Sequence, residues 1–307
     1  MSFLHITPYC TACISMRRAA ELEALPIDNS EKLAIYRQLL DAVNLYITPD
    51  TEVVELATVS FRRLKALVKQ STPYEQLIEQ NLSKAVARAK SIEDLIAGKP
   101  IDERLSLALR AASLATGYRA FNTPDKILEE PPSTVDLTAL GTSLQVGRDD
   151  TRRVVRLLHD LQRNGGTIYY LFGSVFELPY DAILLRILVN DLGLSVAGIT
   201  RSDRYEDYVV TEDLESIGIA DTLSEVIDLG SDDVTVTIDS NEHLYEQLNN
   251  ASLVVVKGEL QATYFHNNPV EAPMLFLFAV PCPVIARAFN LPPRSFNIVL
   301  QEKPRQG

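Results

Sequence analysis

The chain has few cysteines, and it lacks both an uninterrupted apolar run and a leader-like first segment. Only three of its 307 residues are cysteines, too few for a disulfide framework and compatible with a reducing compartment. Its longest apolar stretch, APMLFLFAVPCPVIARAF, is broken by prolines and an arginine, so a membrane span is excluded. The opening MSFLHITPYC lacks the basic segment and apolar run of a signal peptide. We therefore expect a soluble, cytoplasmic protein.

Positive charge is also scarce. The chain has 29 lysines and arginines against 41 aspartates and glutamates, which gives a net charge of −12. A mean field of this sign repels a phosphate backbone, so nucleic acid is excluded as a general partner. A local basic pocket for a small phosphorylated ligand remains compatible with this charge.

Several catalytic motifs are absent. The sequence has no GxSxG elbow, no Walker loop and no GxGxxG fingerprint, which removes three common hydrolase and nucleotide-binding classes. Its histidines form no HxH or HExxH pair and are His5, His159, His243 and His266. His159 falls within an amphipathic helical pattern, where a structural role is expected, and His266 follows Lys257 closely enough to line the same pocket.

The first part of the chain has only helical patterns. Residues 1–120 are predicted to form a helical N-terminal domain, with apolar side chains near a 3.6-residue period over 30–47. Another helix is predicted to begin with a capping box formed by Thr72 and Glu75. Residues 121–150 are rich in proline and small polar residues, which is typical of a connecting segment.

From residue 151 to 307 helices alternate with apolar strands. The predicted strands are TIYYLFG, LSVAGIT, SLVVVKG, MLFLFAV and FNIVLQE. Strands without polar alternation, separated by helices, predict a Rossmann-like, mostly parallel sheet with helices on both faces. Ligands bind such sheets outside the carboxyl ends of the strands. We therefore expect the strand tips at Leu171, Thr200 and Val256 to converge on one crevice.

The segments around these tips resemble a known family. TPYCTACI, FNTPD, YYLFGSVFELPYDAILLRIL, GITRSDRYEDYVVTEDLESIGI, ASLVVVKGELQATY and FAVPCPVIARAFNL resemble, in this order, motifs of the damage-control phosphatases, or domain of unknown function 89. The likeness is to the branch that has an N-terminal CxxC. The resemblance implies hydrolysis of small phosphate esters, including sugar phosphates, with a divalent Mg²⁺, Mn²⁺, Co²⁺ or Ni²⁺ ion.

The same resemblance locates the metal ligands. The family's Asp-Asn pair falls on Gly173 and Ser174, and the aspartate of its Asn-Asp-x-Thr motif falls on Tyr208. A hard cation needs oxygen ligands, and the family's ligand is missing at all three positions. Glu177 and Asp207 remain as predicted metal ligands and catalytic residues of a reduced site.

The resemblance also predicts a phosphate-binding site, formed by residues at the ends of the strands. Arg201 would hold the phosphate with a bidentate fork and Lys257 as a point charge, with Gly258 and Ser174 beside them. The alternative is that the two cations form surface ion pairs, with Asp203, Glu206 or Glu259 as partners. Asp181, near a helix start, matches the family too, but a carboxylate there is stabilised by the helix dipole whatever its function.

All three cysteines fall on family motif positions. Cys10, Cys13 and Cys282, joined by a histidine such as His5, would suit a tetrahedral zinc ion. The alternative is that the cysteines have a structural role, in which Cys282, which follows Pro281, packs as a small buried apolar side chain.

Two functional hypotheses follow. In the first, the chain is a divergent metal-dependent phosphatase with reduced activity on small phosphorylated metabolites. In the second, it is a non-catalytic pseudoenzyme that binds a phosphorylated metabolite or a protein partner. The sequence leaves open whether the protein is an enzyme. Neither hypothesis involves nucleic acid or a membrane.

Overall fold

A seven-stranded sheet lies at the centre of the computed structural model, which describes residues 4–68, 72–129 and 146–302. The strand order is β1-β7-β6-β5-β2-β3-β4. Neighbouring strands run parallel except β6 and β7, which are antiparallel. The strands are β1 (Val146–Asp149), β2 (Thr167–Leu171), β3 (Ser195–Thr200), β4 (Glu225–Asp228), β5 (Leu253–Lys257), β6 (Met274–Ala279) and β7 (Phe296–Gln301).

The apolar strands predicted from the sequence form the middle of this sheet. Every residue of β5 and β6 is buried, because helices cover both faces and leave no polar face to solvent. The predicted Rossmann-like α/β fold class is confirmed. Strand β1 lies inside the segment predicted as a connection, and its residues VGRD are mostly exposed, so no apolar pattern marks it.

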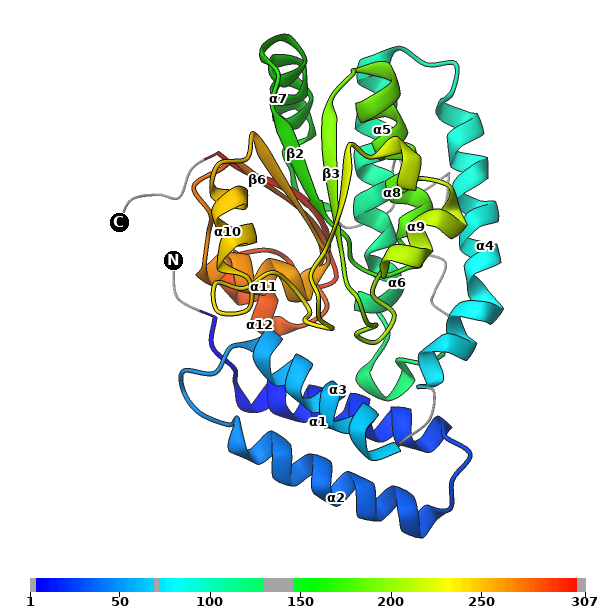
Figure 1. Cartoon of the computed structure of the whole chain (residues 1–307), viewed down its shortest axis with the longest axis vertical. Coiled ribbons are helices and arrows are strands. Elements are labelled where there is room, and N and C mark those ends of the chain that lie inside the picture. The colour runs from blue at the N-terminus through cyan, green and yellow to red at the C-terminus, as the bar shows by residue number, and fades with distance from the viewer. Residues whose placement is uncertain (1–3, 69–71, 130–145, 303–307) are drawn as a thin grey trace.

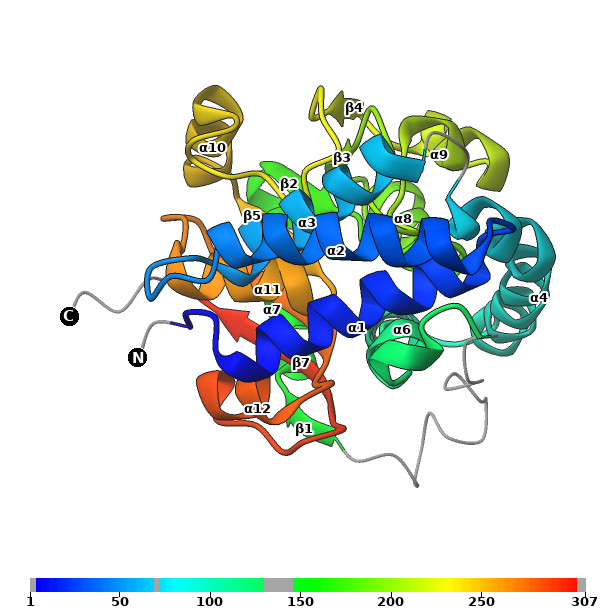
Figure 2. The ribbon, with the colours of Figure 1, turned by 90° about the horizontal axis from the view of Figure 1, so that it is seen from below.

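Helices lie on both faces of the sheet. Figure 2 shows α10, α11 and α12 on one side and α4, α8 and α9 on the other. Helix α5 contacts β6, β7, α7 and α8. These helices are α4 (Pro73–Ile96), α5 (Ile101–Ala115), α7 (Thr151–Asn164), α8 (Leu178–Arg186), α9 (Thr211–Ile217), α10 (Glu242–Asn249), α11 (Glu259–Asn267) and α12 (Pro283–Phe289). A π-helical turn, Ile187–Asp191, extends α8, and two short 3₁₀ turns lie at Pro124–Lys126 and Ala220–Thr222.

Three N-terminal helices lie across the ends of the strands. They are α1 (Pro8–Ala24), α2 (Asn29–Leu45) and α3 (Val53–Val68). Figure 1 shows them below the sheet, and Figure 2 shows them crossing the strand ends. Side chains of α1 and α3 contact the loop after β3, since Arg18 pairs with Glu206 and Lys65 with Asp203. The short helix α6 (Gly117–Ala120) follows α5.

The two helices predicted over 30–47 and after Thr72 begin within one residue of the predicted starts, but the capping differs. Helix α2 is capped by Asp28, whose carboxylate accepts from two main-chain amides. At α4, Thr72 makes no capping bond to the backbone, and its hydroxyl donates to Glu75 instead, at 2.9 Å. The predicted capping bond from Thr72 is therefore not formed, and a side-chain hydrogen bond joins the two residues in its place.

The boundaries predicted at residues 120 and 150 stay predictions. Helix α5 lies before residue 120, and it packs on β6 and β7. In the part of the chain that the structure describes, no helix has the length and apolarity to cross a membrane.

Candidate functional site

The loops after β2 and β3 are joined to each other at the strand tips. The Val209 amide donates to the Gly173 carbonyl at 2.9 Å, and the Val175 amide donates to the Asp207 carbonyl at 2.8 Å. Strand β2 lies between β3 and β5, so all three tips lie side by side. The predicted proximity of these tips is confirmed, but the predicted crevice is not, since Ser174, Glu177 and Asp207 in the loops beyond them are buried. The polar side chains gathered here are called the polar centre, and all are buried except Arg17, which is partly exposed. They are Arg17, Arg18, Arg119, Ser174, Glu177, Asp181, Arg201, Glu206, Asp207, Lys257 and Glu259.

Asp207 is held between a hydroxyl and a guanidinium. The Ser174 hydroxyl donates to Asp207 Oδ2 at 2.6 Å, and Arg119 Nη1 lies 3.0 Å from Asp207 Oδ1. The Asp207 side chain is fully buried. Both carboxylate oxygens therefore face a partner supplied by the protein itself.

Glu206 binds three arginines. Its carboxylate pairs with Arg17 at 3.2 Å, with Arg119 at 2.7 Å and with Arg18. Burial by itself raises the pKa of Glu206, but these three cations outweigh it and lower the pKa to about 2. The backbone of Glu206 has φ 47°, a left-handed conformation that costs about 1–2 kcal/mol in a residue with a side chain. The arginine contacts offset that cost.

A second carboxylate pairs with Arg18. Glu21 Oε1 lies 2.9 Å from Arg18 Nη2 and accepts a hydrogen bond from the Tyr74 hydroxyl at 2.6 Å. Burial raises the pKa of Glu21 to about 7, against the opposing effect of Arg18. The arginines of the polar centre are thus surrounded by acids with very different pKa values.

Lys257 is fully buried and has three partners. Its ammonium lies 2.7 Å from Asp181 and 3.2 Å from Glu177, and it donates to the Ala112 carbonyl at 2.6 Å. The Tyr170 hydroxyl also donates to Asp181. Burial raises the pKa of Glu177 to about 8, although Lys257 opposes the shift. The alternative prediction of a surface ion pair for Lys257 is wrong, because its partners are these two buried acids.

Arg201 is bound by main-chain carbonyls. Its Nε donates to Asp233 O at 2.8 Å, its Nη1 to Phe172 O at 3.1 Å, and its Nη2 to Val234 O. Its guanidinium stacks 4.5 Å from the centre of the Tyr208 ring. Burial lowers the pKa of Arg201 to about 10. The surface-pair prediction for Arg201 is wrong as well. Its role in phosphate binding stays a prediction, which these contacts do not favour.

The residues at the predicted metal position do not fit a divalent cation. A side-chain carbon at Gly173 would lie 3.1 Å from Glu177 Oε2, so Glu177 occupies the space into which a ligand at position 173 would project. At position 208 stands a tyrosine packed on Arg201. Within residues 4–68, 72–129 and 146–302, no three His, Cys, Asp or Glu side chains are grouped to hold a metal ion.

The three cysteines line one cavity of about 150 Å³. Burial raises the pKa of both the Cys13 and the Cys282 thiol, which opposes the thiolate form that zinc requires. His5 is not among the residues that line this cavity. The geometry of the described residues therefore does not support the predicted zinc site, although it does bring the thiols together.

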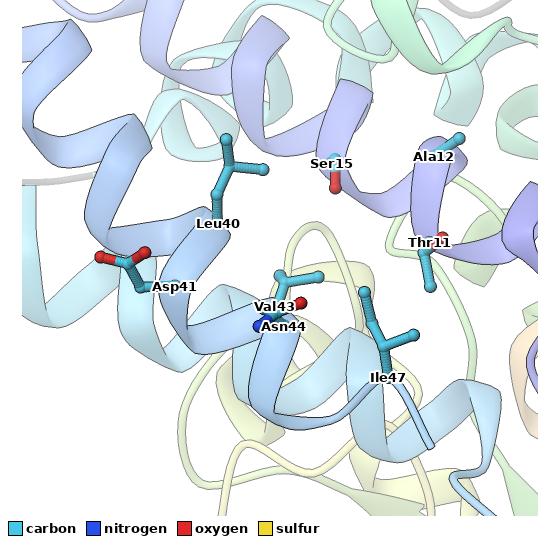
Figure 3. Close-up of a pocket in the computed structure, with 8 residues that line it drawn as sticks. All are labelled: Thr11, Ala12, Ser15, Leu40, Asp41, Val43, Asn44 and Ile47. Carbon is cyan, nitrogen blue, oxygen red and sulfur yellow. The ribbon is translucent and has the colours of Figure 1, made fainter. Parts of the chain in front are cut away.

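A second hollow lies between α1 and α2 and opens to solvent. Figure 3 shows the residues that line it, which are Thr11, Ala12, Ser15, Leu40, Asp41, Val43, Asn44 and Ile47. Asp41 is the only charged side chain among them. This groove offers no combination of nucleophile, base and electrophile, so we assign it no chemistry.

The sequence predicted the place of the polar centre but missed its arginines. Arg17 and Arg18 come from α1, and Arg119 comes from α6. Adjacent arginines inside the apolar pattern of a helix are the one signal that would have indicated buried cations. No local pattern marks Arg119.

Comparisons with known proteins agree with this fold. A family model described as the damage-control phosphatase ARMT1-like domain matches residues 6–294. Among solved structures, a DUF89 family protein from Pyrococcus horikoshii is similar, with a TM-score of 0.74 and 18% identity over 96% of this chain and 98% of that chain. At this identity the likeness shows the fold alone. The comparison with curated proteins found no match.

Proposed function

Because this chain belongs to the damage-control phosphatase ARMT1-like family, we propose that it is a non-catalytic member that binds a ligand without hydrolysing it. The observation that carries the proposal is the state of Asp207. This carboxylate directly precedes position 208 in the chain, and it is bound by Ser174, at a second changed ligand position, and by Arg119. A cation would have to displace a buried guanidinium to reach it.

Arg119 supplies the positive charge at this place. Asp207 and Glu206 raise the pKa of Arg119 further above its ordinary value, although burial acts in the opposite direction. A guanidinium neutralises an adjacent carboxylate, but it has no open coordination position at which to activate water. The protein therefore keeps a charge-balanced interior without the chemistry that a bound cation provides.

Glu177 is poorly placed to act as a base in its stead. Its side chain is only 4% exposed and lies 3.2 Å from Lys257. With a pKa raised to about 8 by burial, the carboxyl is largely protonated at neutral pH. A general base must be deprotonated and within reach of the attacking water, and burial works against both conditions at Glu177.

The second candidate is a phosphatase of reduced activity on small phosphorylated metabolites. It is favoured by the family membership and by the position of Glu177, Asp207 and Lys257 at neighbouring strand tips. Asp207 would supply one metal ligand if Arg119 moved away. An activity assay separates the two candidates.

We expect purified protein to hydrolyse p-nitrophenyl phosphate no faster in Mg²⁺, Mn²⁺, Co²⁺ or Ni²⁺ than in a chelator, because Asp207 is already paired. Release of p-nitrophenol is the measurement, with Asp207→Ala and Glu177→Ala assayed alongside to identify contaminating activity. Metal-stimulated hydrolysis that disappears in both variants would establish the phosphatase instead.

A further inference from the structure

The outer face of helices α1 and α2, called the α1–α2 face, is rich in exposed apolar side chains. Helix α2 packs on α1 and α3, and no other described element covers its outer side (Figures 1 and 2). Of the ten large apolar side chains that are exposed in the described chain, six belong to α1, α2 or the turn after α2. They are Tyr9, Met16, Leu33, Leu40, Leu45 and Ile47. Such a concentration marks an interaction surface.

Three of these side chains form a stripe along α2. Leu33, Leu40 and Ile47 are spaced seven residues apart, which places them on nearly the same side of the helix. The stripe borders the open groove between α1 and α2, because Leu40 and Ile47 also line that groove (Figure 3). Helices pack by inserting the side-chain ridge of one into the groove of another. A face that has both a ridge and a groove can therefore pack against a copy of itself.

The net charge of the chain restricts where two copies can meet. At −12, the mean field of one copy repels another, so contact requires a face that does not carry this excess. The charged residues of α1 sum to zero, and so do those of α2. They are Arg17, Arg18, Glu21 and Glu23 in α1, and Glu31, Lys32, Arg37 and Asp41 in α2.

Two charges beside the stripe suit a two-fold arrangement. Arg37 and Asp41 are exposed and lie one helical turn apart, and neither forms an ion pair with another described residue. In an antiparallel pair of α2 helices with the two-fold axis near Leu40, Arg37 of each copy lies within one turn of Asp41 of the other. The face is therefore complementary to itself in charge, because the same pair forms twice.

The size of the face sets the strength of the contact. Helices α1 and α2 have 17 residues each, which corresponds to a length of about 25 Å, and side by side they are about 20 Å wide. Two such faces bury about 1,000 Å² in total, which is the lower limit for a specific interface and typical of a weak one.

We propose that this protein forms a weak two-fold dimer through the α1–α2 face, with Leu40 near the axis and Arg37 of each copy paired with Asp41 of the other. The dissociation constant lies in the micromolar range, as expected for an interface of about this area. This dimer is independent of the proposed ligand-binding role.

Sedimentation velocity of the full chain, from about 1 µM to about 500 µM, covers this range of affinity. We expect the mean mass to rise with concentration towards that of two chains. Leu40→Asp places two negative charges together near the axis and is expected to weaken the dimer by about a hundredfold. The matched control is Leu95→Asp on α4, where the replaced side chain is 48% exposed. It should dimerise like the unaltered protein, and circular dichroism checks that both variants fold.

A charge exchange tests the pairing itself. Arg37→Asp and Asp41→Arg each place like charges across the interface, so each is expected to weaken the dimer by about tenfold. The double variant has the same two charges in exchanged positions and should recover the dissociation constant of the unaltered protein. Association driven by apolar contact alone would not show this recovery.

A chain that stays monomeric over the whole range would overturn the inference and leave the face to a partner of different sequence. A dimer that survives Leu40→Asp, or one that the double charge exchange does not restore, would overturn it as well. Sedimentation requires neither hydrolysis nor a ligand. A positive phosphatase assay would therefore refute the proposed function without affecting the dimer, and a monomeric chain would not affect the proposed function.

Discussion

Replacing Glu206 with glutamine is expected to lower the free energy of unfolding by about 3–5 kcal/mol, the usual cost of removing one partner from a buried ion pair. Glutamine keeps the shape and the backbone conformation, but it leaves Arg17, Arg18 and Arg119 without their shared anion. Urea unfolding followed by circular dichroism measures the change.

The matched control is Glu23→Gln. The Glu23 side chain is 74% exposed and pairs with Lys32 at 3.4 Å, a surface contact worth about 0–1 kcal/mol. A loss below about 1 kcal/mol in Glu206→Gln as well would show that the arginines do not depend on Glu206.

The pH dependence of this effect has a definite sign. The folded pKa of Glu206 is about 2, below the ordinary value of 4.5, so the native state releases this proton more readily than the unfolded chain. Its contribution to stability is present above about pH 4.5 and is lost as the pH falls towards 2. We expect that part of the acid-induced loss to be absent in Glu206→Gln.

Lys257→Met is the second substitution with a large expected effect. It leaves Glu177 and Asp181 buried together without a cation, and we expect a loss of about 3–5 kcal/mol at pH 8. At pH 5 the loss should be smaller, because both acids can become neutral by protonation. Thermal unfolding at the two pH values gives the comparison.

Glu177 determines the sign of this pH effect. Its folded pKa of about 8 lies above the ordinary 4.5, so folding takes up a proton between these values and stability falls as the pH rises through that window. Removal of Lys257 should steepen the fall. The control, Lys90→Met, changes a lysine whose side chain is 63% exposed. It should leave the free energy of unfolding unchanged at both pH values. A loss that is the same at pH 5 and pH 8 would contradict the assigned pairing.

The five central strands of the sheet were predictable because they are largely buried, whereas the edge strands β1 and β4 are not. Runs such as LVVVK in β5 have no polar alternation, and this pattern arises where helices cover a parallel sheet. Strand β1 was missed because pairing with β7, rather than an apolar sequence, makes VGRD a strand. Main-chain hydrogen bonds carry no sequence signal.

The sequence predicted where the candidate site lies, but it did not predict which groups its side chains contact. Arg201 and Lys257 were placed correctly at the strand tips by chain order. Their partners are main-chain carbonyls and acids of another element. Contacts such as Arg18–Glu206 join residues 188 positions apart, and helical periodicity says nothing about which distant side chain will meet them.

Binding of Mn²⁺ followed by electron paramagnetic resonance tests the central claim, that Arg119 and Ser174 hold Asp207 where the family's cation would bind. We predict that the free-ion signal keeps its full intensity when Mn²⁺ is added at stoichiometric amounts to the unaltered protein. Loss of about one equivalent of that signal, restored by Asp207→Ala, would contradict the account.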